Sequence, residues 1–273
     1  MRIALCLTGL LGGLNGRNGI GKTIDPRNGY YWYNKNIFKG NKIDVFIHTW
    51  QENDFNLIDL YKPKAYIIED QINFSNLDYN FYGCESYEDL YLKEERLNNN
   101  YVFNNSEVED LKGLIFRSNS KWNSTHKVIK LKKEYEKKYQ FKYDFVIISR
   151  FDIALTKKIN FYKLNKEILY LSARGVNQSN ADRSFNDLIF LGDSKVIDLF
   201  AQIYTERNKY SVDPTYACYE HIIKNKINWA DFFQYEKNTF LFRWNQNLMK
   251  FSPQPYYFIR HKLRQIKRKI LNA

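Results

Sequence analysis

Short apolar runs alternate with amphipathic stretches along the first half of the chain. The runs at 2–8, 43–48 and 65–69 have the length and the composition of β-strands. Between the first two runs, residues recur at spacings of three and four, which predicts a helix over 30–38. Strands that alternate with helices are typical of an α/β sheet with parallel strands.

The clearest amphipathic pattern in the chain spans 124–139. Val128, Leu131 and Tyr135 fall on one stripe, while Lys and Glu occupy most positions between them, so we expect a helix here. This helix leads into the apolar run 145–148, whose pattern suits a central strand buried on both faces. Further strands are predicted at 168–171 and 188–191, and further helices at 87–97, 194–207 and 215–226.

These elements predict an α/β fold in which helices flank a mostly parallel, Rossmann-like sheet. Neither a repeat nor a Pro- and Ser-rich linker divides the chain, so we expect one domain over 1–257 in two halves, 1–152 and 153–257. The remaining residues, 258–273, are expected to form a basic appendage.

The segment 258–273 holds a large share of the positive charge. The chain has 42 Lys and Arg against 30 Asp and Glu, a net charge of +12, and six of the basic residues lie between Arg260 and Lys269. Apolar residues recur among them as in a basic amphipathic helix, at Ile259, Leu263, Ile266 and Ile270. Since each basic residue near an anionic leaflet contributes about 1 kcal/mol, we expect this segment to dock on an anionic membrane surface. The alternative is a solvated helix that packs on its own domain.

The remaining composition favours a cytoplasmic protein, peripheral on the inner face of the membrane. No apolar run reaches the roughly 18 residues of a membrane helix, and the three cysteines lie far apart, as in proteins of a reducing compartment. The N-terminus imitates a signal peptide, but no small-x-small cleavage site follows, and Gly12 and Gly13 would interrupt its helix. A buried first strand explains this segment better.

The segment Gly16-Arg-Asn-Gly-Ile-Gly-Lys-Thr23 matches the phosphate-binding pattern G-x-x-x-x-G-K-[ST]. In a P-loop a helix follows at once, whereas here Asn28-Gly29 predicts a turn, and several residues separate the motif from the first strand. We therefore interpret the segment as a glycine-rich loop over a ligand cleft, in which Arg17 and Lys22 are candidates for phosphate contact. An NTPase or phosphotransferase that uses residues 16–23 as a true P-loop is the first alternative.

Polar residues follow two of the predicted strands at the ends where ligands bind in open α/β sheets. Thr8 and Gly9 end the first strand, and Arg150 and Asp152 end the strand after the long helix. An Asp in this position can hold Mg²⁺ or Mn²⁺ on a diphosphate, and an Arg two residues earlier can clamp a phosphate from the same face. The alternative is a buried Arg–Asp ion pair at the end of a strand.

Several segments resemble, in order, a glycosyltransferase-like group of bacterial and viral surface-polysaccharide proteins with the GT-A fold. These segments are Arg2-Ile-Ala-Leu-Cys-Leu-Thr-Gly9, Val45-Phe-Ile-His-Thr-Trp50, Ser120-Lys-Trp122, Tyr143-Asp-Phe-Val-Ile-Ile-Ser-Arg-Phe-Asp152 and Asn186-Asp-Leu-Ile-Phe-Leu-Gly192. In this group an Arg-x-Asp stands where many GT-A enzymes carry Asp-x-Asp, and in this chain Arg150 takes the position of the first carboxylate.

The resemblance implies a GT-A-like fold in which the first half of the chain binds a nucleotide-sugar donor and the second half binds the acceptor. It implies that Thr8 and Gly9 lie against the nucleotide. It also implies that Asp152 binds the sugar diphosphate or a Mn²⁺ or Mg²⁺ ion, while Arg150 can supply part of such an ion's charge. Asp187 resembles the acid that deprotonates the acceptor hydroxyl. Its alternatives are an Asx turn at Asp187 and a rival base at Asp182.

The implied activity is that of a glycosyltransferase. It would move a sugar from a nucleotide-diphosphate sugar to a glycan or lipid-linked acceptor during the synthesis of a surface polysaccharide such as lipopolysaccharide or capsule. A nucleic-acid-binding protein is the second alternative, but the chain has no DNA- or RNA-binding motif, so no nucleic-acid partner is expected. His48, Trp50 and Trp122 are expected to be core residues, and His221 is not assigned a role.

Overall fold

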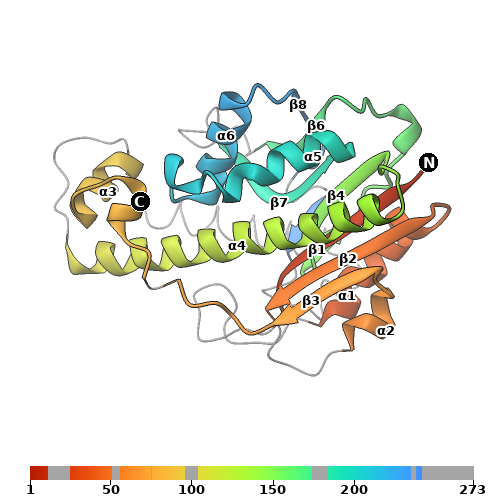
Figure 1. The fold of residues 1–273 in the computed structure, drawn as a ribbon, viewed down its shortest axis with the longest axis horizontal. Helices are drawn as coiled ribbons and strands as arrows, with labels where there is room; N and C mark the ends of the chain where they lie inside the picture. The colour runs from red at the N-terminus through yellow and green to blue at the C-terminus, as the bar shows by residue number, and fades with distance from the viewer. Residues whose placement is uncertain are drawn as a thin grey trace, which may run out of the picture.

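Seven strands form one mixed, mostly parallel sheet at the centre of the molecule (Figure 1). The computed structural model describes residues 1–11, 25–50, 56–74, 76–95, 104–173, 184–234 and 238–241. The strands of the sheet are β1 (Ile3–Leu10), β2 (Ile43–Trp50), β3 (Ala65–Glu69), β4 (Phe145–Arg150), β6 (Leu169–Ala173), β7 (Phe185–Gly192) and β8 (Trp229–Asp231). Their order is β3-β2-β1-β4-β7-β6-β8, and of these seven only β7 runs antiparallel to its neighbours. Two short strands, β5 (Ile153–Leu155) and β9 (Thr239–Leu241), form a separate antiparallel pair.

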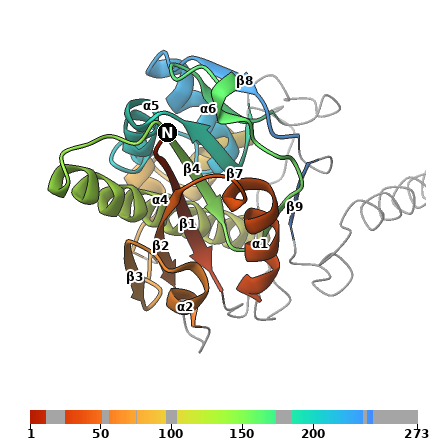
Figure 2. The same ribbon diagram turned by 90° about the vertical axis from the view of Figure 1, so that its right-hand side faces the viewer.

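Helices cover both faces of this sheet (Figure 2). The helix α1 (Pro26–Tyr33) and the π-helical turn Asn34–Phe38 lie on one face, while α4 (Asn105–Lys138), α5 (Ser194–Phe200) and α6 (Pro214–Lys224) lie on the other. Two further helices, α2 (Leu57–Tyr61) and α3 (Tyr87–Glu95), lie at the periphery. Short 3-10 turns occur at Tyr79–Tyr82, Phe161–Lys163, Ala201–Tyr204 and Arg207–Lys209.

The alternation of side chains along the central strands builds one hydrophobic core on each face. Leu5 and Leu7 of β1 pack on the α1 side together with Tyr33. Cys6, between them in sequence, packs on the α4 side together with Trp122. Because successive strand residues point to opposite faces, a near-continuous apolar run is needed to fill both cores. The predicted α/β fold with helices on both faces is therefore confirmed.

The long helix α4 begins well before the predicted residue 124. Asn104 caps its first turn by accepting from the amide of Ser106, and the Glu107 carboxylate accepts from the amide of Asn104 at 2.9 Å, which completes a capping box. Lys137 and Lys138 lie in its last turn, where their positive charges interact favourably with the negative end of the helix dipole. The predicted start was wrong because the middle of the helix, 117–127, carries Trp122 as its one apolar residue, so the apolar stripe is interrupted there and the turns before it were not recognised as part of the same helix.

The predicted turn at Asn28-Gly29 is also wrong. The helix α1 begins at Pro26, and the Asp25 side chain caps it by accepting from the amide of Arg27 at 2.9 Å. A proline in the first helical turn loses no hydrogen bond, and an Asp cap compensates the low helix propensity of Gly29.

No helix in the described ranges is long and apolar enough to cross a membrane. The three cysteines are buried and unpaired. The predicted basic helix at 258–273 lies outside the described residues.

Candidate functional site

The site lies where the strand order reverses. β1 pairs with β2 on one side and with β4 on the other, both in parallel, so the carboxyl ends of three strands meet at one edge. The register aligns Thr8 with His48 in β2 and with Arg150 in β4. In open α/β sheets, ligands bind outside the carboxyl ends at such a switch point. The sheet thus brings the predicted residues Thr8, Gly9 and Arg150 together.

Gly9 leaves room beside this edge. Its φ is +122°, a conformation that side chains rarely adopt, and a Cβ placed on it would meet no described atom within 4 Å. The hydroxyl of Thr49 donates to the Gly9 carbonyl at 2.7 Å and holds this part of the backbone in place. A ligand can therefore approach the backbone closely at Gly9.

Arg150 and Asp152 form a two-point ion pair just beyond β4. The Arg150 Nε donates to one Asp152 oxygen at 2.8 Å, and Nη2 donates to the other at 2.7 Å. The Arg150 side chain keeps 18% of its surface exposed, whereas Asp152 keeps only 3%. Burial would lower the pKa of Arg150, but Asp152 raises it above its ordinary value. The guanidinium is thus charged, fixed in orientation and partly accessible.

Tyr33 of α1 supports this pair from the other face of the sheet. Its hydroxyl donates to the Arg150 carbonyl at 2.6 Å and lies 2.8 Å from the Ser149 hydroxyl. Burial raises the pKa of Tyr33, so the hydroxyl keeps its proton and remains a donor. The backbone that carries Arg150 is therefore anchored at two consecutive residues.

Asp187 in β7 pairs with Lys121 of α4. The Lys121 Nζ lies 3.2 Å from an Asp187 carboxylate oxygen and also donates to the Asp187 carbonyl. The two side chains keep 17% and 19% of their surface exposed. Burial alone would raise the pKa of Asp187, but Lys121 and Arg150 together lower it below its ordinary value. Burial lowers the pKa of Lys121, and the nearby charge of Arg150 lowers it further.

The Arg150–Asp152 and Lys121–Asp187 ion pairs interact electrostatically through Arg150. Arg150 influences the protonation of both Asp187 and Lys121, so the two ion pairs lie within electrostatic reach. Lys121 was not predicted as a site residue. Lys121 lies in the segment 120–122 that contributes to the resemblance, but no role was implied for it, and only the fold brings it to Asp187.

A buried chain of hydrogen bonds fixes the adjacent end of β2. The two ring nitrogens of His48 lie 2.7 Å from the Ser124 hydroxyl and 2.9 Å from a Glu69 oxygen, and Lys127 pairs with Glu69. Ser124 keeps only 1% of its surface exposed and His48 none, so no substrate reaches this serine. The arrangement holds β2, β3 and α4 together, and the prediction of a hydrogen-bonded core histidine is confirmed.

The donor set at Asp152 does not fit a divalent cation. Both carboxylate oxygens already accept from the Arg150 guanidinium, whose positive charge opposes a second cation at the same place. The described residues also hold no group of three or more His, Cys, Asp or Glu side chains that could ligate a metal. Mg²⁺ and Mn²⁺ require several oxygen ligands.

Other predicted residues fall into two groups. Trp50 and Trp122 are buried, as expected of core side chains, and His221, which was assigned no role, is also buried and lies 3.0 Å from the Tyr210 hydroxyl. The remaining candidates lie outside the described residues: Arg17, Lys22, Asp182 and the motif at 16–23.

No family model matches the chain, and no curated protein is similar to it.

Proposed function

We propose that this protein is a glycosyltransferase that moves a sugar from a nucleotide-diphosphate sugar to a glycan or glycolipid acceptor. The observation that carries the proposal is the oriented Arg150 guanidinium at the switch point of the sheet, beside Thr8 and Gly9. A planar, partly exposed guanidinium suits the oxygens of a diphosphate, which it can contact at two points. The GT-A-like fold that the sequence resemblance implies is consistent with helices on both faces of a mostly parallel sheet.

In this proposal the nucleotide lies against the backbone at Thr8 and Gly9, and its diphosphate meets Arg150. Asp152 is a positioning residue, because its carboxylate holds the guanidinium in one orientation. Lys121 supplies a second positive charge near the leaving diphosphate. Charge that develops on this leaving group is stabilised by fixed cations that need no reorganisation, which is a large contribution in most such reactions.

Asp187 is the base of this proposed reaction. Its lowered pKa keeps it ionised at neutral pH, so it can accept a proton. In an inverting transfer, the acceptor hydroxyl gives its proton to Asp187 and its oxygen bonds to the anomeric carbon. The bond between that carbon and the diphosphate oxygen breaks, and the nucleoside diphosphate leaves. No step passes through a metal ion, since the donor set at Asp152 does not fit one.

A thermal-shift panel tests this proposal. UDP-, GDP- and CMP-sugars are added with Mn²⁺ or with EDTA, and ATP–Mg²⁺ is a separate arm. We expect a diphosphate sugar to raise the melting temperature in both Mn²⁺ and EDTA. Arg150→Lys should weaken the affinity for that sugar about tenfold or more, so a higher donor concentration is needed for the same rise. Arg27→Lys is the matched control, because Arg27 is largely exposed and pairs only with Asp25 among the contacts described for it.

Each rival function has its own signature, either in the ATP arm of this panel or in a separate DNA-binding assay. Stabilisation by ATP alone that is lost in Lys22→Ala would favour the P-loop alternative. Binding to DNA that weakens steeply with salt would favour a nucleic-acid-binding protein. Equal stabilisation of wild type and Arg150→Lys by the sugar donors would contradict the role given to Arg150.

A further inference from the structure

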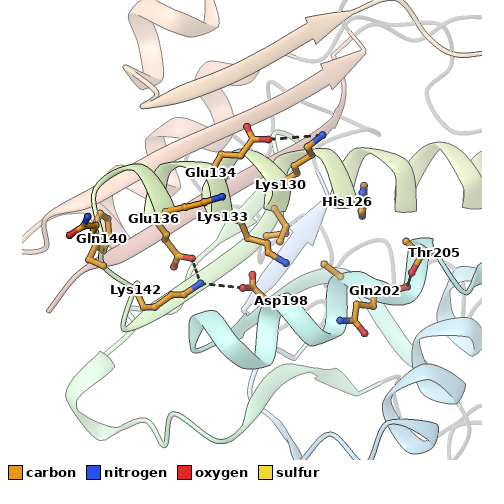
Figure 3. Close-up of a pocket in the computed structure, with 14 residues that line it drawn as sticks. His126, Lys130, Lys133, Glu134, Glu136, Gln140, Lys142, Asp198, Gln202 and Thr205 are labelled. Carbon is orange, nitrogen blue, oxygen red and sulfur yellow. Dashed lines mark hydrogen bonds and ion pairs between the residues drawn. The ribbon is translucent and has the colours of Figure 1, made fainter.

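A groove runs along α4 on its side toward α5 and the 3-10 turn Ala201–Tyr204 (Figure 3). Its volume is about 800 Å³, within the range of sites that bind small organic molecules. On α4 it extends from His126 to Lys137, a span of about 17 Å at the rise of an α-helix. The groove is separate from the Arg150 site, so a ligand bound in it is independent of the proposed sugar transfer.

The acidic side chains at one end of the groove are already neutralised. Glu136 accepts from Lys142 at 2.8 Å and from the buried Lys132 at 3.2 Å. Asp198 accepts from Lys132 at 2.6 Å and lies 3.7 Å from Lys142. Two lysines thus face two carboxylates, and this cluster leaves little net charge for a ligand.

Two other lysines on the same wall form no ion pair with a described residue, and the third acid of the lining, Glu134, lies 4.0 Å from Lys130. These two lysines, Lys133 and Lys137, lie one helical turn apart and are exposed. Figure 3 shows Lys133 extending across the groove toward α5. Burial lowers the pKa of His126 at the other end, and the charges of Lys130 and Lys133 lower it further. The lining therefore favours an anion.

The floor of the groove is apolar. Ile129 and Ala201 are buried beneath it, and Phe141 lines one end. A free phosphate ion would leave this floor without a partner, and an acidic peptide would place polar backbone over it. A molecule with one anionic group and a hydrocarbon chain satisfies the lysines and the floor together.

We propose that this groove binds an anionic membrane lipid. The lipid phosphate lies between Lys133 and Lys137, and one acyl chain follows Ile129 and Ala201 along the floor. This contact holds α4 against an anionic membrane surface. It is independent of any contact made by residues 258–273.

The test titrates a monomeric short-chain lipid, dihexanoylphosphatidylglycerol, into the full chain and follows binding by calorimetry. Lys133→Gln/Lys137→Gln should weaken binding about 30-fold, the combined contribution of two lysines near a lipid phosphate. The matched control Lys158→Gln/Lys163→Gln removes two exposed lysines outside the groove and should change binding less than about twofold. Both pairs are exposed, so melting temperatures close to that of the wild type verify the fold.

A second variant acts from the opposite wall. Gln202→Glu places a carboxylate across the groove from Lys133 and should weaken lipid binding, whereas Asn208→Asp, an exposed change outside the groove, should not. Three probes complete the test. Dihexanoylphosphatidylcholine should bind at least tenfold more weakly than the anionic lipid, and so should inorganic phosphate and hexaglutamate. The proposal would be overturned if the two lipids bound with equal affinity, or if phosphate or hexaglutamate bound as tightly as the anionic lipid or more tightly. Wild-type affinity in Lys133→Gln/Lys137→Gln would also overturn it.

Discussion

Gly29 of α1 lies directly against the backbone of Phe151, the residue between Arg150 and Asp152. A Cβ placed on Gly29 would lie 2.3 Å from the Phe151 carbonyl oxygen, well inside any normal contact. The first helix can therefore approach the turn after β4 only because residue 29 has no side chain. This contact, together with the Tyr33 hydroxyl, sets the position of the Arg150–Asp152 pair.

Gly29→Ala should disturb the candidate site. The added methyl group must displace the Phe151 backbone, which costs about 1–3 kcal/mol for an overpacked contact. We expect a lower free energy of unfolding in urea and a weaker response to the nucleotide-sugar donor. Gly113→Ala is the control, because its Cβ would meet only the flexible end of Arg117 at 2.9 Å, and it should be neutral or stabilising by up to about 1 kcal/mol. A fully stable Gly29→Ala would contradict the close contact.

Lys132 is the second position where a substitution should be costly. It is fully buried and donates to Glu136, Asp198 and the Ser194 hydroxyl at 2.6–3.2 Å. Lys132→Met leaves the two carboxylates with Lys142 as the one remaining cation among their described partners, and should cost about 3–5 kcal/mol of the free energy of unfolding. The neighbouring exposed Lys133→Met should change it by no more than about 0.5 kcal/mol. Equal urea midpoints for the two variants would show that the buried cluster contributes nothing specific.

The sequence predicted six of the nine described strands, because each of these six is a short apolar run, whereas the three-residue strands β5, β8 and β9 were not predicted. The third strand was predicted at 65–69, its observed bounds, since Pro63 precedes it and Asp70 follows it. The start of α4 was missed, although Asn104 and Glu107 form a recognisable capping pair. The direction of β7 could not be predicted, because an apolar run carries no sign of whether its neighbours are parallel.

The candidate site was only partly predictable for the same reason. Thr8, Gly9 and Arg150 could be predicted to share one edge, because parallel strands place their carboxyl ends together. The contact of Asp152 with Arg150 depends on the turn after β4, and the contact of Lys121 with Asp187 depends on how α4 packs on β7. Neither packing arrangement leaves a periodic signal in the sequence.

Buried histidines should make the protein less stable in mild acid. Burial lowers the pKa of His48 below its ordinary value, and it does the same for His221. Between the lowered folded value and the ordinary value near 6.5, the unfolded chain binds more protons than the folded one, so stability rises with pH in this window. The free energy of unfolding should fall from pH 7.5 to pH 5, by at most about 1.4 kcal/mol per pH unit for each histidine. In urea titrations His48→Gln should flatten this slope, and an unchanged slope would contradict a neutral buried His48.

Lys121 should control the pH range in which Asp187 can act as a base. Burial alone would raise the pKa of Asp187, and Lys121 is the strongest influence that lowers it. Lys121→Met removes that charge, so Asp187 should bind a proton at higher pH than in the wild type. We therefore expect the acid limb of the kcat/KM profile to move toward higher pH, in an assay with the donor that the thermal-shift panel identifies.

Lys127→Met is a matched control on the same helix. Lys127 also pairs with a carboxylate, that of Glu69, and packs over the Trp50 ring, but it makes no described contact with Asp187. Its loss should leave the acid limb in place even where it lowers stability. A purely structural role for Lys121 would reduce kcat/KM at all pH values without moving the limb, and such a profile would exclude Asp187 as the base. A limb that moves only in Lys121→Met would instead connect the observed ion pair to proton transfer, because no change in stability alone shifts the pH at which one carboxylate titrates.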